Sequence, residues 1–85
     1  MRQETILASI ERRIGGDFKS WVCGIAEDPK VARAEAQSHG YNTGSWKQWQ
    51  AESTKDARAI EQFARQKGCQ RAPSGGMKAI WVYIY

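Results

Sequence analysis

Two cysteines and one histidine are the soft metal-binding side chains of this 85-residue sequence: Cys23, His39 and Cys69. A closed zinc site usually takes four nitrogen or sulfur ligands in short, paired spacings, and these three residues have no such pairing. We therefore expect no zinc site. Because the sequence starts without a charged-then-apolar secretion signal, we expect a cytoplasmic protein with reduced thiols.

Positive charge is the second chemical feature of the sequence. Lys plus Arg is 13 and Asp plus Glu is 9, a net charge of +4 that favours polyanionic partners. From residue 53 onward, the sequence contains six cationic residues and only two acidic residues, Asp56 and Glu61. Phosphate contacts supply most sequence-independent affinity for nucleic acids. The pattern predicts binding of DNA or RNA, with four phosphate contacts among these cations: Arg58, Arg65, Arg71 and Lys78.

Tryptophans offer flat surfaces on which bases can stack if the rings are exposed. Trp46 and Trp49 flank Lys47 on a polar stretch, so we add Lys47 and Trp49 to the predicted nucleic-acid-binding residues. The other interpretation is that the four tryptophans build the core of a small domain, and we favour it for Trp21 and Trp81. The glycine-rich stretch 71–76 lacks the lysine and serine or threonine that end a phosphate-binding P-loop, and it reads as a plain turn.

The elements that must position these residues follow from periodicity and capping signals. Helices are predicted over residues 5–14, 29–38 and 53–67, and strands over 18–26, 45–51 and 79–85. Gly24 interrupts the first strand, which indicates a bulge or a close approach by another backbone. The last strand is apolar on both faces and is expected at the centre of the sheet.

These elements fit one domain over residues 1–85. The predicted fold is a small α/β domain whose three-stranded sheet, mixed or antiparallel, is packed by two or three helices. No apolar stretch approaches the roughly 20 residues that a membrane-spanning helix needs, so we expect no membrane partner.

Three stretches together resemble the GIY-YIG nuclease domain. The run WVCGIAEDP over residues 21–29, followed by Arg33 and His39, is similar to the family's second strand and first helix. Residues 57–61 resemble the helix that carries the family's metal-binding glutamate, and residues 82–85 resemble its first strand, displaced to the end of the chain. The resemblance covers residues 20–85 and leaves the helix within residues 1–16 outside. It is to a degenerate member, because Val22 and Ala26 stand where the family has tyrosine and threonine.

The resemblance implies a GIY-YIG-like fold and metal-dependent cleavage of phosphodiesters. It makes Glu61 a ligand for Mg²⁺ or Mn²⁺, Arg33 a clamp for the phosphate, and Tyr83 a base or phosphate donor. It also implies that all three side chains converge on one rim of the molecule. By residue type alone, Arg33 is equally explained as an exposed helix charge. Glu61 is better explained as an exposed helix charge and Tyr83 as a packed sheet aromatic.

Three functions are therefore open. The first is nucleic-acid binding by a degenerate GIY-YIG-like domain with weak or no catalysis. The second is an active metal-dependent nuclease. The third is a protein-interaction module that forms a homodimer through an edge of its sheet.

Overall fold

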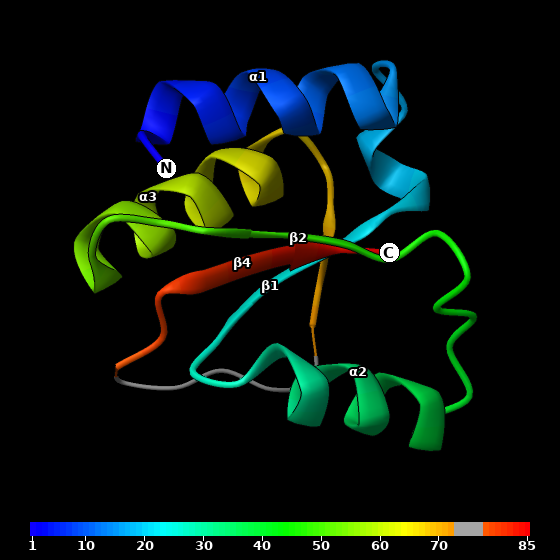
Figure 1. Cartoon of the computed structure of the whole chain (residues 1–85). Helices are drawn as coiled ribbons and strands as arrows, with labels where there is room; N and C mark the ends of the chain where they lie inside the picture. Colours follow the sequence, from blue (N-terminus) through cyan, green and yellow to red (C-terminus); the bar gives the residue numbers. More distant parts are fainter. Residues whose placement is uncertain (73–77) are drawn as a thin grey trace.

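The computed structural model describes residues 1–72 and 78–85. In this part of the chain, helices and strands alternate from α1 to β3, and β4 is the last element; a short 3₁₀ turn at Phe18–Ser20 precedes the first strand (Figure 1). The elements in chain order are α1 (Gln3–Ile14), β1 (Val22–Ala26), α2 (Pro29–Ser38), β2 (Lys47–Gln50), α3 (Thr54–Gln66), β3 (Gln70–Arg71) and β4 (Trp81–Ile84). The α/β class is confirmed.

The sheet is mixed and has four described strands in the order β2-β4-β1-β3. Strand β4 runs antiparallel to both neighbours, while β3 pairs with β1 in parallel. The prediction of three strands was wrong, because β3 is only two residues long and lies in a polar stretch with no strand periodicity. A backbone hydrogen bond of 2.9 Å from Gln70 N to Trp21 O fixes it beside β1.

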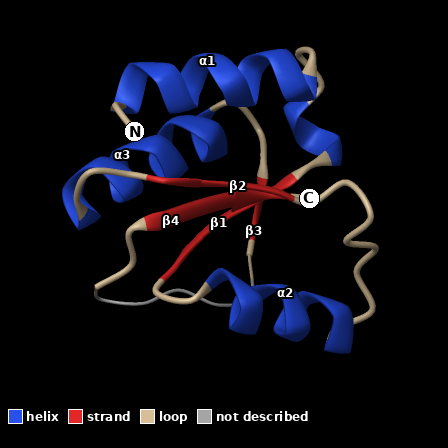
Figure 2. Cartoon of the chain, in the orientation of Figure 1, coloured by secondary structure: helices blue, strands red, loops and turns tan. Residues whose placement is uncertain are grey.

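Two helices cover one face of the sheet and one helix covers the other (Figure 2). Helices α1 and α3 pack with Cys23, Ile25 and Val82 in one core cluster. Helix α2 packs with Tyr83 and its neighbours in a second cluster on the opposite face. Strand β4 lies between β2 and β1 and supplies both clusters, so its predicted central position is confirmed.

Local signals explain where α2 and α3 begin. The Asp28 carboxylate accepts a hydrogen bond of 2.9 Å from the Lys30 amide, and Pro29 occupies the first helical turn. The Ser53 hydroxyl oxygen accepts a hydrogen bond of 3.1 Å from the Asp56 amide. Each cap contributes about 1 kcal/mol to stability. Both helices therefore start where the sequence predicts.

Two expectations for the first strand and the glycine-rich turn have different outcomes. The predicted strand start at Phe18 was wrong, because the Trp21 amide donates to the Phe18 carbonyl at 3.1 Å and closes a 3₁₀ turn there. The glycine-rich turn lies mostly outside the described residues. In the described part of the chain, no helix is both long and apolar enough to pass through a membrane.

Candidate functional site

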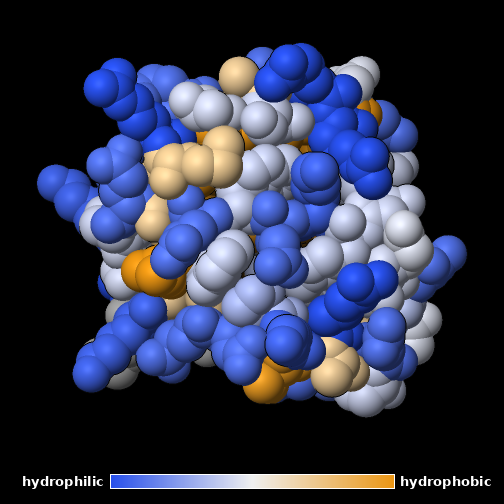
Figure 3. All heavy atoms as spheres, in the orientation of Figure 1, coloured by the Kyte–Doolittle hydropathy of each residue, from blue (hydrophilic) through white to orange (hydrophobic). Residues whose placement is uncertain are grey.

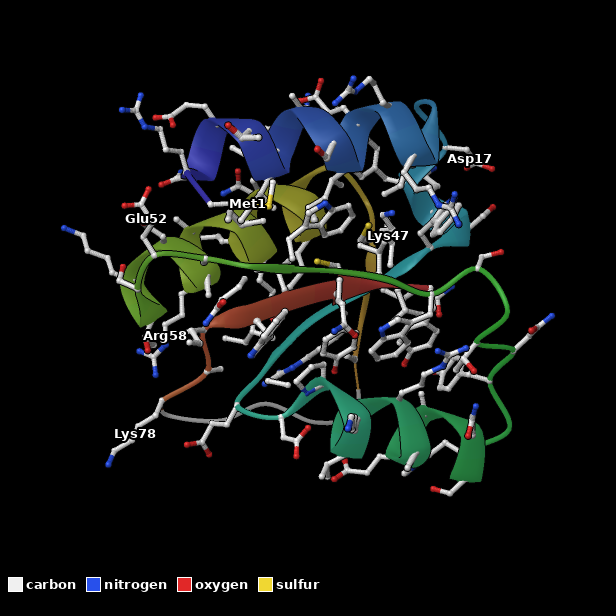
Figure 4. The ribbon with its side chains drawn as sticks, in the orientation of Figure 1. Met1, Asp17, Lys47, Glu52, Arg58 and Lys78 are labelled. Atoms are coloured by element: carbon white, nitrogen blue, oxygen red, sulfur yellow. The ribbon has the colours of Figure 1, made fainter. Side chains whose placement is uncertain are left out.

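An open groove of about 430 Å³ lies between α1 and β2. We call it the α1–β2 groove, and its lining residues are Ser9, Arg12, Arg13, Lys47 and Trp49. Three of these five side chains are cationic, and no carboxylate occurs among the described residues that line the groove. Figure 4 shows Lys47 between the ribbons of α1 and β2. The groove is therefore a cationic surface formed by two segments that are distant in sequence.

The periods of the two elements put these residues together. Helix α1 buries Ile6, Ile10 and Ile14 against the sheet, which leaves Arg12 and Arg13 exposed near its end. Successive side chains of a strand point to opposite faces, so Lys47 and Trp49 share the face that α1 covers. Trp49 is 7% exposed and forms the floor of the groove, rather than an open stacking surface.

Two contacts tie the edge strand β2 to the amino-terminal part of the chain. A guanidinium nitrogen of Arg13 donates to the Ser45 carbonyl at 3.3 Å. The amino group of Met1 donates to the Gln50 carbonyl at 2.8 Å. Among the described strands, β2 has a neighbour on only one side, and the Met1 contact satisfies one carbonyl of this edge strand. The Arg13 contact holds the chain two residues before β2.

A cluster of stacked rings lies on the opposite face of the sheet, toward α2. We call it the aromatic cluster: Tyr41, Trp46, Tyr83 and Tyr85. The Trp46 ring stacks on Tyr83 with centroids 4.5 Å apart and on Tyr85 at 5.2 Å, both nearly parallel. Tyr41 meets Tyr85 edge-on at 5.4 Å. Such pairs add about 0.5–1.5 kcal/mol each beyond burial.

Arg33 joins the aromatic cluster from α2. Its guanidinium carbon lies over the Trp46 ring, 5.9 Å from the centroid. The same guanidinium donates to the Thr43 carbonyl at 3.2 Å, and Gln37 donates to the Thr43 hydroxyl at 2.9 Å. Thr43 is only 5% exposed, so these hydrogen bonds anchor the guanidinium to a buried loop residue.

The buried hydroxyl of Tyr85 has no hydrogen-bond partner among the described residues. Burial, with a smaller contribution from the neighbouring phenols of Tyr83 and Tyr41, raises the pKa of Tyr85 to about 12. Since the raised pKa keeps this phenol neutral, its contribution to stability is complete below about pH 10 and is lost as the pH rises toward 12.

The structure does not bring the three expected catalytic residues together. Arg33 and Tyr83 belong to the α2 face, where Tyr83 is 1% exposed. Glu61 lies on α3, which covers the other face. Its carboxylate contributes to the raised pKa of Cys23 in the core on that side. The expected convergence of Arg33 and Glu61 on one rim was therefore wrong. The physical reason is the chain path, because α2 and α3 pack on opposite faces of the sheet.

The residues predicted to bind nucleic acid are dispersed. Lys47 lies in the α1–β2 groove, whereas Arg71 lies on β3 at the far edge of the sheet. Arg58 and Arg65 are exposed on α3. Figure 4 shows Arg58 and Lys78 well away from Lys47, toward the end where β4 begins.

Sequence reasoning missed the cations that accompany Lys47. Arg12 and Arg13 fall in the last turn of α1, where positive charge is already explained by the negative end of the helix dipole. The sequence does contain a basic pair in α1 and a lysine in β2. Their proximity follows only from the tertiary contact between α1 and β2, which the sequence does not reveal.

Cys23 and Cys69 are buried and form no disulfide. Burial raises the pKa of the Cys23 thiol far above its usual range, and the nearby Cys69 and Glu61 raise it further. Burial alone raises the pKa of Cys69 to about 11. The raised pKa values favour the protonated form of both thiols, which is the less nucleophilic form. Among the described residues, no group of three His, Cys, Asp or Glu side chains is arranged to hold a metal ion.

Comparison with known proteins identifies no relative. No family model, no curated protein and no solved structure matches this chain. A function for this protein therefore has to be inferred from its own residues and their arrangement.

Proposed function

We propose that this protein binds nucleic acid through the α1–β2 groove. The observation that supports the proposal is the convergence of Arg12, Arg13 and Lys47 on one open groove of about 430 Å³. Cations that line one groove repel one another, and a bound phosphate backbone neutralises that repulsion. The same cations release counterions that are condensed on the nucleic acid. The net charge of +4 adds a long-range attraction for the same ligand.

The outer surface of the groove suits an extended polyanion. Figure 3 shows hydrophilic side chains over most of the face that includes α1 and α2, with apolar residues only as separate spots. Interfaces with nucleic acid are more polar and more positively charged than interfaces between proteins. A second copy paired through the edge of β2 would instead bring two sets of groove cations together, which disfavours the homodimer.

The proposal contains binding without a cleavage step. Arg33 and Tyr83 lie on the α2 face and Glu61 on the α3 face, so these groups do not surround a common phosphate. Mg²⁺ or Mn²⁺ at Glu61 is accordingly not needed for the proposed activity.

A pair of matched lysine variants tests the proposal. Lys47→Gln removes one groove cation, whereas Lys55→Gln removes one exposed cation of α3. We expect Lys47→Gln to weaken binding of a short DNA or RNA oligonucleotide about five- to ten-fold at low salt, the effect of one lost phosphate contact. Fluorescence anisotropy titration measures both affinities.

We expect Lys55→Gln to bind like the wild type. Equal losses in the two variants would show that general charge, not the groove, carries the binding. Absence of binding to DNA and RNA at low salt would refute the proposed function itself.

A further inference from the structure

The α1–β2 groove and the aromatic cluster both include a residue at the start of β2. Trp46 directly precedes Lys47, and alternation along an extended chain directs the two side chains to opposite faces of the sheet. Lys47 enters the α1–β2 groove, while Trp46 joins the aromatic cluster on the α2 face. Arg13 links the two sides, because its guanidinium contacts the carbonyl of Ser45, one residue before Trp46. A ligand that passes around this end of the edge strand β2 can therefore contact both the groove cations and the aromatic cluster.

Trp46 is a supported but accessible ring. It is partly exposed, in contrast to the buried Tyr83 and Tyr85 on which it stacks. Its indole N–H donates to the side-chain oxygen of the exposed Gln48 at 2.9 Å, so its polar edge faces the surface rather than the core. The ring is held by Tyr83 and Tyr85, and the Arg33 guanidinium also lies over it, so the group loses little conformational freedom when a flat ligand docks.

Arg33 adds a second planar group to this platform. The guanidinium lies over Trp46 and is anchored through Thr43, yet Arg33 is exposed. A guanidinium plane stacks on a nucleobase and also attracts the adjoining phosphate. The exposed Arg33 guanidinium, supported by Trp46, therefore presents a plane on which an unpaired base can stack.

We infer that the nucleic acid bound in the α1–β2 groove is single-stranded, and that one of its unpaired bases stacks on the Arg33–Trp46 platform. This inference rests on the proposed function. A duplex offers its phosphates to the groove but keeps its base faces inside the helix. A single strand offers both, and base stacking on an aromatic ring is tolerant of sequence. The platform thus adds affinity only for a single strand.

The test compares three probes of the same length under one salt condition. They are an oligothymidylate of about 12 nucleotides, its duplex with the complementary strand, and an abasic oligomer with the same backbone. We expect the wild type to bind the oligothymidylate roughly ten-fold more tightly than either of the other two probes, the effect of one well-stacked base.

Two variants remove the platform in different ways. Trp46→Leu removes the ring, and Arg33→Lys keeps the charge but removes the plane. We expect Trp46→Leu to abolish the preference for the oligothymidylate and Arg33→Lys to reduce it several-fold, with duplex affinity unchanged in both. Lys30→Gln is the control on α2, because this exposed lysine lies on the same helix as Arg33, and we expect it to keep the preference. Arg33→Lys keeps the test decisive if Trp46→Leu does not fold.

The outcomes separate the two proposals. Equal affinity for the oligothymidylate and the abasic oligomer would overturn this inference, and so would a preference that survives both Trp46→Leu and Arg33→Lys. Neither result would affect the proposal that the groove binds nucleic acid. Failure to bind all three probes would instead overturn the proposed function, and the inference with it.

Discussion

At the scale of single residues, Gly24 leaves the least room for a side chain among the described glycines. A β-carbon at Gly24 would lie 2.5 Å from the Ala72 β-carbon and 2.6 Å from the Tyr83 ring. Gly24 pairs with Tyr83 across the sheet, and the tyrosine ring fills the space that a side chain would occupy. The sequence indicated a bulge or a close approach by another backbone at this glycine, whereas the structure shows a close approach by two side chains. The buried Tyr83 in turn supports Trp46.

Substitution at Gly24 tests this packing. We expect Gly24→Ala to lower the free energy of unfolding by about 1–3 kcal/mol or more, because neither Ala72 nor the Tyr83 ring can move aside without disturbing the α2 face. Gly44→Ala is the matched control. Its nearest neighbour would be the Asn42 side-chain oxygen at 3.1 Å, an exposed group that needs to shift by only a few tenths of an ångström. Urea denaturation measures both variants, and equal losses would contradict the packing argument.

At the scale of secondary-structure elements, α1 has two roles. Ile6 and Ile10 are 0% exposed and pack in the same core cluster as α3. The exposed face of the helix supplies Arg12 and Arg13 to the groove. The resemblance to the GIY-YIG domain placed residues 1–16 outside its core, whereas the structure makes this helix part of the fold's main core.

Truncation within α1 tests that integration. We expect Ile10→Ala to lower the free energy of unfolding by about 2–5 kcal/mol, the cost of a cavity at a fully buried aliphatic residue. Val31→Ala is the control, since Val31 on α2 is 53% exposed and its loss costs less than about 0.5 kcal/mol. If Ile10→Ala were as stable as Val31→Ala, α1 would not belong to the core.

The sequence predicted elements better than their arrangement. The caps at Asp28 and Ser53 act locally, and the helices begin there as expected. Strand β3 escaped detection because its two residues carry no periodicity and exist as a strand only through β1. The face that each helix covers depends on the path of the whole chain, so the separation of Arg33 from Glu61 could not be predicted from spacing.

At the scale of the whole molecule, each face of the sheet carries one of the two proposed binding surfaces. One face carries the α1–β2 groove, and the other carries the aromatic cluster, with the start of β2 between them. Sequence composition placed the basic surplus from residue 53 onward, but the charges of that segment are spread over α3 and the far edge of the sheet. Local cation density, which governs phosphate contact, arises instead where the first helix meets β2.

The salt dependence of oligothymidylate affinity tests the account most directly. Simultaneous replacement of Arg12, Arg13 and Lys47 by glutamine should reduce the slope of log affinity against log salt by about 2, since each phosphate contact to a single strand contributes about 0.7. A matched triple replacement on α3 should leave the slope near that of the wild type; its positions are Lys55, Arg58 and Arg65. A groove variant that kept the wild-type slope, while the α3 variant lost it, would contradict the account.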